Sequence, residues 1–103
     1  MSERPSSPGG GWPEEPEPAD LVAAAARSIP GVTDLHAGAF GEVATYLPGR
    51  RVVGVRLGDD LTEVHVVVAM GSPVLITSEA VRQAVSPLVT TPVDVYVEDV
   101  DRT

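Results

Sequence analysis

The sequence predicts an α+β fold, a two-layer sandwich with the order helix, β-meander, helix and strand and with both helices on one face of a mixed sheet. Apolar residues occupy alternate positions along 64–70 and along 93–97, which is the period of a β-strand. Between these runs Gly71 breaks the first strand, and Ser72 and Pro73 suit the cap and the first residue of a helix. Strand–helix–strand connections in one sheet are almost always right-handed crossovers, so we expect the last strand to run parallel to the strand at 64–70.

The first helix is expected from about Pro18 to Ser28. Asp20 stands in its first turn, where a negative charge favours the helix dipole, and Pro30 ends the helix. The adjacent alanines allow close packing on a sheet. The residues expected to face the sheet are Leu21, Val22, Ala25 and Ile29.

The second helix is expected to end or kink near Val85 or Ser86. Pro87 removes a backbone donor there and clashes with the carbonyl four residues earlier. The stripe expected to face the sheet consists of Val74, Val81, Val85, Leu88 and Val89.

Three short strands are expected to form the meander with the strand at 64–70. Glycine, proline and aspartate mark the turns, because these residues suit the backbone angles of tight bends. The strands are expected at 32–37, 42–47 and 52–57, with turns at 38–41, 48–49 and 58–60.

A chain of 103 residues is long enough for one domain. We expect residues 1–18 to form a disordered tail rich in Pro, Gly and Glu, and residues 19–103 to form the domain. Trp12 in this tail is interpreted as a solvated or loosely packed side chain, with a docking anchor as the alternative. No Cys is present, so stability comes from packing rather than from disulfides.

Charge and hydropathy limit the partners. The formal charge is −8, and Arg50–Arg51 is the one local basic cluster, so we expect no nucleic-acid binding and no direct adsorption to an anionic membrane. No apolar run approaches the about 20 residues of a membrane span. The N-terminus also lacks the pattern of a signal peptide, so we expect a cytoplasmic protein without direct membrane insertion.

The sheet face opposite the helices is the candidate partner face. Strand alternation places two tyrosines, an arginine and a histidine on it, and Tyr and Arg are enriched in the anchors of protein interfaces. An ordinary solvated sheet face is the alternative. The residues of this face are Tyr46, Arg56, His65, Val67 and Tyr96.

No catalytic constellation is recognisable, so we expect no enzyme, no cofactor and no metal. The histidines His36 and His65 show no metal-ligand spacing, although a site of His65 with Glu63 or with Asp59–Asp60 is conceivable. The Gly38–Gly41 segment resembles a phosphate loop, but it leads into a strand rather than a helix N-terminus and is interpreted as a bend. An exposed edge at the strand of Val32 or of Val97 would allow dimerisation, which the neighbouring acidic residues Asp94, Glu98 and Asp99 disfavour.

Several segments between Leu21 and Val100 match the pattern of one protein family. They are residues 26–32, residues 40–51, the pair Gly71 and Pro73, residues 81–85, and residues 92–100, which read PVDVYVEDV. In these segments the chain resembles the alkaline shock protein family of envelope stress response proteins, especially its short actinobacterial members.

The resemblance implies a non-enzymatic cytoplasmic protein that a small integral membrane partner holds near the membrane, with a role in cell-envelope stress. It brings no catalytic residues. The leading hypothesis is therefore a scaffold or adaptor that binds a protein partner, or a second copy, through the candidate partner face. The alternative is a small-ligand or nucleotide-binding regulatory module that uses the Gly38–Gly41 bend with Arg50–Arg51.

Overall fold

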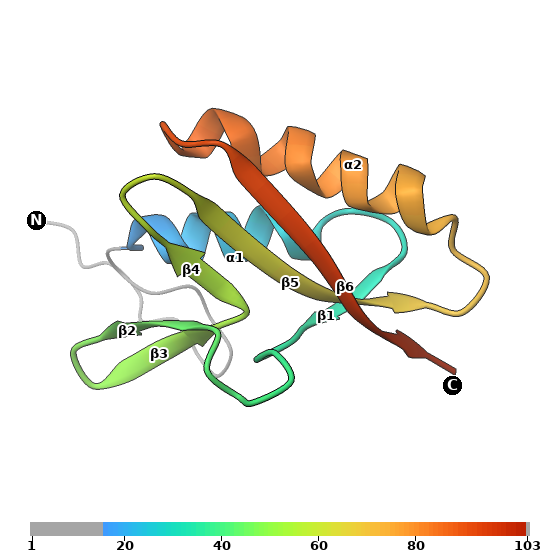
Figure 1. The fold of residues 1–103 in the computed structure, drawn as a ribbon, viewed down its shortest axis with the longest axis horizontal. Helices are drawn as coiled ribbons and strands as arrows, with labels where there is room; N and C mark the ends of the chain where they lie inside the picture. The colour runs from blue at the N-terminus through green and yellow to red at the C-terminus, as the bar shows by residue number, and fades with distance from the viewer. Residues whose placement is uncertain (1–15, 103) are drawn as a thin grey trace, which may run out of the picture.

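The computed structural model describes residues 16–102 and has an α+β architecture (Figure 1). The predicted tail falls mostly on residues 1–15, outside the described part, while the first helix begins at Pro18 as expected. In chain order the elements are α1 (Pro18–Arg27), β1 (Val32–Leu35), β2 (Ala44–Leu47), β3 (Arg50–Val53), β4 (Val55–Leu57), β5 (Thr62–Ala69), α2 (Val74–Val85), the short 3-10 helix η1 (Ser86–Leu88) and β6 (Val93–Asp101).

Strand β5 is the centre of the main sheet. β6 runs parallel to it along one side, with Val64 opposite Val95, so the predicted parallel last strand is confirmed. On the other side β4 and β1 each pair antiparallel with β5, one after the other along its length. The α2 helix is the crossover that makes the parallel pairing possible.

The meander is not one continuous sheet, contrary to the prediction. The expected strand at 52–57 is divided at Gly54, and β2 and β3 form a separate two-stranded sheet. Gly54 has φ +85°, and a Cβ there would lie 2.8 Å from Leu35 Cβ and 3.0 Å from the His65 carbonyl oxygen. The bend therefore depends on glycine, which adopts a positive φ and leaves room for close backbone approach.

Both helices cover the same face of the main sheet, as predicted; in Figure 1 α1 lies behind the strands and α2 runs along their upper side. Val64, Val66 and Val68 of β5 point into this core and are almost fully buried. The strand face expected to meet the helices does so at these three valines, but Met70, the last apolar residue of the expected alternation, lies beyond the end of β5 and is exposed. The core also contains Ala19, Val22, Ala23, Ala26, Leu35, Val52, Val55, Val81, Val85 and Val93.

The buried face of α1 differs from the prediction. Val22 is buried as expected, but Leu21 is exposed, and Ala25 and Ile29 are only partly buried. The helix instead turns its alanines inward, because α1 contacts both α2 and the sheet and small side chains permit that close approach. The buried alanines are Ala19, Ala23 and Ala26.

The α2 helix ends at Val85, where Pro87 was expected to stop it, and η1 follows. Val81 and Val85 are buried and Val89 is partly buried, as predicted, whereas Val74 and Leu88 at the two ends of the stripe are exposed. Pro73 occupies the N-cap position and no side chain caps the helix, so the expected Ser72 cap is wrong. Neither helix within residues 16–102 is long and apolar enough to cross a membrane.

Candidate interaction surfaces

A polar cluster occupies the sheet face that the helices leave open. His65 is at its centre, with Nδ1 2.6 Å from Glu98 Oε2 and Nε2 3.1 Å from Glu63 Oε1. The Tyr96 ring stacks on the imidazole, with the ring centroids 4.5 Å apart. Arg56 Nη1 lies 3.6 Å from the other oxygen of Glu63. These five residues, Arg56, Glu63, His65, Tyr96 and Glu98, are called the outer-face cluster.

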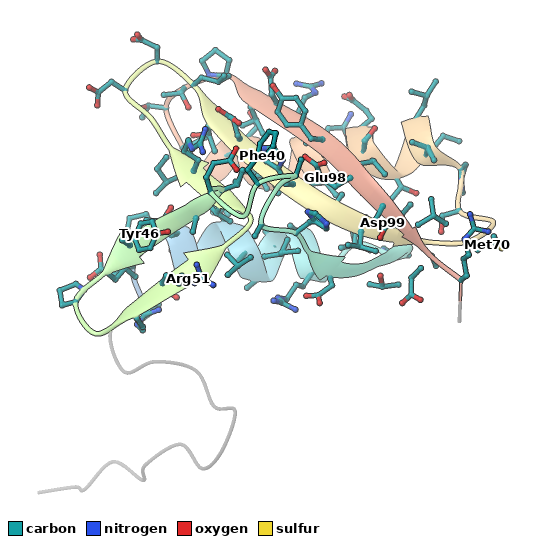
Figure 2. The ribbon with its side chains drawn as sticks, turned by 60° about the horizontal axis from the view of Figure 1, so that its bottom comes forward. Phe40, Tyr46, Arg51, Met70, Glu98 and Asp99 are labelled. Carbon is teal, nitrogen blue, oxygen red and sulfur yellow. The ribbon has the colours of Figure 1, made fainter. Side chains whose placement is uncertain are left out.

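A β-bulge in β6 lies at Glu98, the residue that contacts His65. The pairing of β5 with β6 shifts between Val66–Val97 and Val67–Asp99, so Glu98 is an extra residue in β6. Bulges commonly redirect side chains, and this one places Asp99 rather than Glu98 opposite Val67 of β5. Both acidic residues are labelled on β6 in Figure 2. The valines that pack against the core show the same extra residue, because Val95 and Val97 are two positions apart whereas Val97 and Val100 are three positions apart.

The charged groups of the outer-face cluster face one another. His65 is buried, and a carboxylate faces each ring nitrogen. A neutral imidazole has one N–H and can donate to one of these carboxylates, whereas the imidazolium donates to both. Partial burial, and then the negative charges of Asp94 and Glu63, raise the pKa of the Tyr96 hydroxyl. Because its members pair with one another, the cluster serves first to hold β4, β5 and β6 together.

The predicted partner face is only partly assembled. Arg56, His65 and Tyr96 meet in the outer-face cluster, and Val67 is partly buried. Tyr46 is 68% exposed but stands on the separate β2–β3 hairpin beside Arg51, away from β6 (Figure 2). The alternation of residues in this strand predicted which way the Tyr46 side chain points, but it did not show that the strand lies outside the main sheet.

The groups of the predicted ligand-binding module lie on separate elements. The Gly38–Gly41 segment is a tight turn, closed by a hydrogen bond from the Gly41 amide to the Gly38 carbonyl, and it exposes Phe40. Arg50 on β3 is occupied by Asp20, which accepts two hydrogen bonds from it. Residues 16–102 contain no group of three or more His, Asp or Glu residues that could hold a metal ion. Trp12 is outside the described residues.

A second surface, at the start of α2, was missed by the sequence analysis. Leu75 is 82% exposed, Ile76 is 70% exposed and Met70 is 55% exposed, and Val74 beside them is also exposed. These four residues are called the α2 apolar patch. Met70 lies at the opposite end of the molecule from Tyr46 (Figure 2).

The α2 apolar patch borders a groove between the end of α1 and the start of α2. The groove has a volume of about 630 Å³, and Met70 and Ile76 belong to both the patch and the groove. Its other lining residues are Ile29, Pro30, Gly31, Gly71, Ser72, Pro73, Thr77 and Ala80.

The run Val74-Leu75-Ile76 is the signal that could have revealed this patch. Successive residues of a helix are 100° apart, so three of them cover about 200° of its circumference and cannot all face one core. Thr77 is buried instead, and the apolar residues before it are left outside. An apolar run at a helix start therefore predicts exposed hydrophobic surface here.

The chain was compared with models of protein families, with curated proteins and with solved structures, and none of the three comparisons found a match.

Proposed function

We propose that the chain is a non-enzymatic scaffold or adaptor that acts through protein–protein contacts. The exposed α2 apolar patch is the observation that carries this proposal. Isolated exposed apolar residues are normal on a protein surface, whereas a contiguous group beside a groove is typical of an interaction site. The surface is suited to an apolar helix face of a protein partner, because such helices bind in apolar grooves.

Burial of the patch would supply much of the binding free energy. Covering a fully exposed Leu or Ile side chain contributes about 1.5–3 kcal/mol relative to leaving it in water. Leu75 and Ile76 are the most exposed members and offer the largest gain. The rim residues Glu79 and Arg82 form an ion pair with each other, so the patch has no strong charge of its own.

The setting of this function comes from the resemblance to the alkaline shock protein family. It suggests an envelope stress response role, in which a small integral membrane partner holds the protein near the membrane. We propose that this partner presents the helix that covers the α2 apolar patch. The chain would then be peripheral to the membrane through its partner and would remain cytoplasmic.

Crosslinking in cells, followed by membrane fractionation and mass spectrometry, tests this proposal. A tagged wild-type chain is compared with Ile76→Glu, and with Thr90→Glu, which adds the same charge at an exposed polar position between η1 and β6. We expect the wild type and Thr90→Glu in the membrane fraction, crosslinked to a small membrane protein, and Ile76→Glu released. Equal recovery of all three would remove the patch as the docking surface.

A small-ligand module is the second candidate function, and the groove is the observation that favours it. Its volume of about 630 Å³ is within the range of small-molecule sites, and Ser72 and Thr77 add polar groups to an apolar lining. A thermal-shift screen separates the two functions, because a ligand that binds only the folded state raises the melting temperature. A nucleotide or apolar metabolite that raises it in the wild type but not in Ile76→Glu would favour this alternative.

A further inference from the structure

The outer edge of β6 is open. β6 is nine residues long and pairs with β5 on one side, and no strand in residues 16–102 pairs with its other side. Figure 1 shows β6 as the outermost strand of the main sheet. An unpaired edge presents a row of backbone donors and acceptors that another extended segment can use.

The backbone groups on this edge can be assigned. The Thr62 amide donates to the Pro92 carbonyl, which therefore points toward β5. Successive residues of a strand direct their backbone groups to opposite edges, so the N–H and C=O groups of Val93, Val95 and Val97 point to the open edge. The bulge at Glu98 ends this regular stretch.

The side chains along the edge are acidic. Asp94 and Asp99 are exposed, Glu98 is partly buried against His65, and no basic residue lies between Val93 and Asp101. Pairing with a second copy in the register centred on Tyr96 is unfavourable, because an antiparallel pair of this kind places Asp94 opposite Glu98 of the copy. Like charges directly opposite one another destabilise a strand pair.

We propose that the open edge of β6 binds an extended basic segment of a protein partner, which adds to the main sheet as a further strand. Its backbone would pair with Val93, Val95 and Val97, and Lys or Arg at alternate positions would lie beside Asp94 and Asp99. Backbone pairing supplies the affinity and the alternate side chains supply the specificity. This surface is separate from the α2 apolar patch, so the inference goes beyond the proposed function and gives the scaffold a second binding surface.

Fluorescence anisotropy with labelled peptides tests the edge. The probe is a peptide as long as β6 that alternates Lys with Val, and the control peptide alternates Glu with Val; both are titrated with the full chain. We expect the Lys–Val peptide to bind and the Glu–Val peptide not to bind. Failure of the Lys–Val peptide to bind would overturn the proposal.

Two matched pairs of variants separate edge pairing from attraction to the net charge. Val95→Pro removes an edge-facing amide while keeping the bonds to β5, and Val95→Ala keeps that amide although it shortens the side chain more. We expect Val95→Pro to bind about tenfold more weakly than Val95→Ala, the effect of one good hydrogen bond. Asp94→Lys should weaken binding more than Asp60→Lys, which makes the same charge change in the β4–β5 turn.

Equal binding within both pairs would overturn the proposal, because the peptide would then be bound only through non-specific attraction to the net charge of −8. If Val95→Pro fails to fold, the aspartate pair still decides the question. Self-association of the wild type that is lost in Val95→Pro but kept in Val95→Ala would also overturn it, since the edge would then be an interface between copies.

Discussion

Arg50 holds Asp20 through two parallel hydrogen bonds of 2.8 Å, Nη1 to Oδ1 and Nη2 to Oδ2. Asp20 Oδ2 also accepts a hydrogen bond of 2.7 Å from the Glu17 amide, which lies just before α1. One buried carboxylate thus caps the first helix and fastens the β2–β3 hairpin to it. Because the hairpin does not belong to the main sheet, this contact helps to hold it in place, together with the buried Val52.

Loss of this carboxylate should destabilise the fold. We expect Asp20→Ala to lower the free energy of unfolding by about 1–3 kcal/mol, since hydrogen bonds to a charged group and a helix cap are lost together. Urea unfolding measures the change. Asp34→Ala is the matched control, because it removes an ion pair with Arg27 in which both side chains are exposed. An equally large loss in the control would contradict a special role for Asp20.

The same pair predicts a pH dependence. The hydrogen bonds from Arg50, and then the Glu17 amide, hold the pKa of Asp20 below its ordinary value of 3.8, although burial opposes them. A lowered pKa in the folded state stabilises the fold above pH 3.8, and this contribution is lost as the pH falls through the folded pKa. The difference in unfolding free energy between the wild type and Asp20→Asn should be constant above about pH 5 and shrink below it. A difference that stays constant down to acid unfolding would count against the assignment.

Tyr96 should ionise later than an ordinary tyrosine. Its partial burial, and then the charges of Asp94 and Glu63, raise its pKa above 10.0. The chain has two tyrosines, so Tyr46→Phe leaves phenolate absorbance as a report on Tyr96 alone. In that background Asp94→Asn should move the midpoint to lower pH, with circular dichroism confirming that the fold is intact. An unmoved midpoint would show that the Asp94 charge does not reach the hydroxyl.

Gly54→Ala should be more damaging than Gly49→Ala. Both glycines have positive φ, at +85° and +76°, so each substitution carries a backbone cost of about 1–2 kcal/mol. Only Gly54 has atoms in the way, with Leu35 Cβ, the His36 amide and the His65 carbonyl within 3.0 Å of the added carbon. We expect a total loss of at least about 2 kcal/mol for Gly54. Equal melting temperatures for the two variants would show that the close approach is not needed.

The sequence predicted what depends on local pattern. Alternation in β5 and β6 gave the buried face and therefore the meeting of Arg56, His65 and Tyr96 on the other side. The break at Gly71-Ser72-Pro73, together with the alternating valines before and after α2, predicted that β6 runs parallel to β5. These features follow from a period of two and from turn chemistry, which nearby residues determine.

The remaining features depend on contacts between distant residues. Residues 52–57 have the pattern of one strand, and their division at Gly54 depends on Leu35 and His65. The rotation of α1 depends on α2 and the sheet, which together select the alanine face over Leu21. The α2 apolar patch was missed because every valine of α2 was assigned to the core, although the helix start extends beyond it.

Site-specific photo-crosslinking from position 75 in living cells tests the central claim most directly. A photoreactive amino acid replaces Leu75, the most exposed member of the α2 apolar patch, and in a control chain it replaces the exposed Asp60 in the β4–β5 turn. The scaffold account predicts a discrete protein crosslink from position 75, absent from position 60 and abolished by Ile76→Glu. Position 75 yielding no crosslink, or the same products as position 60, would contradict it.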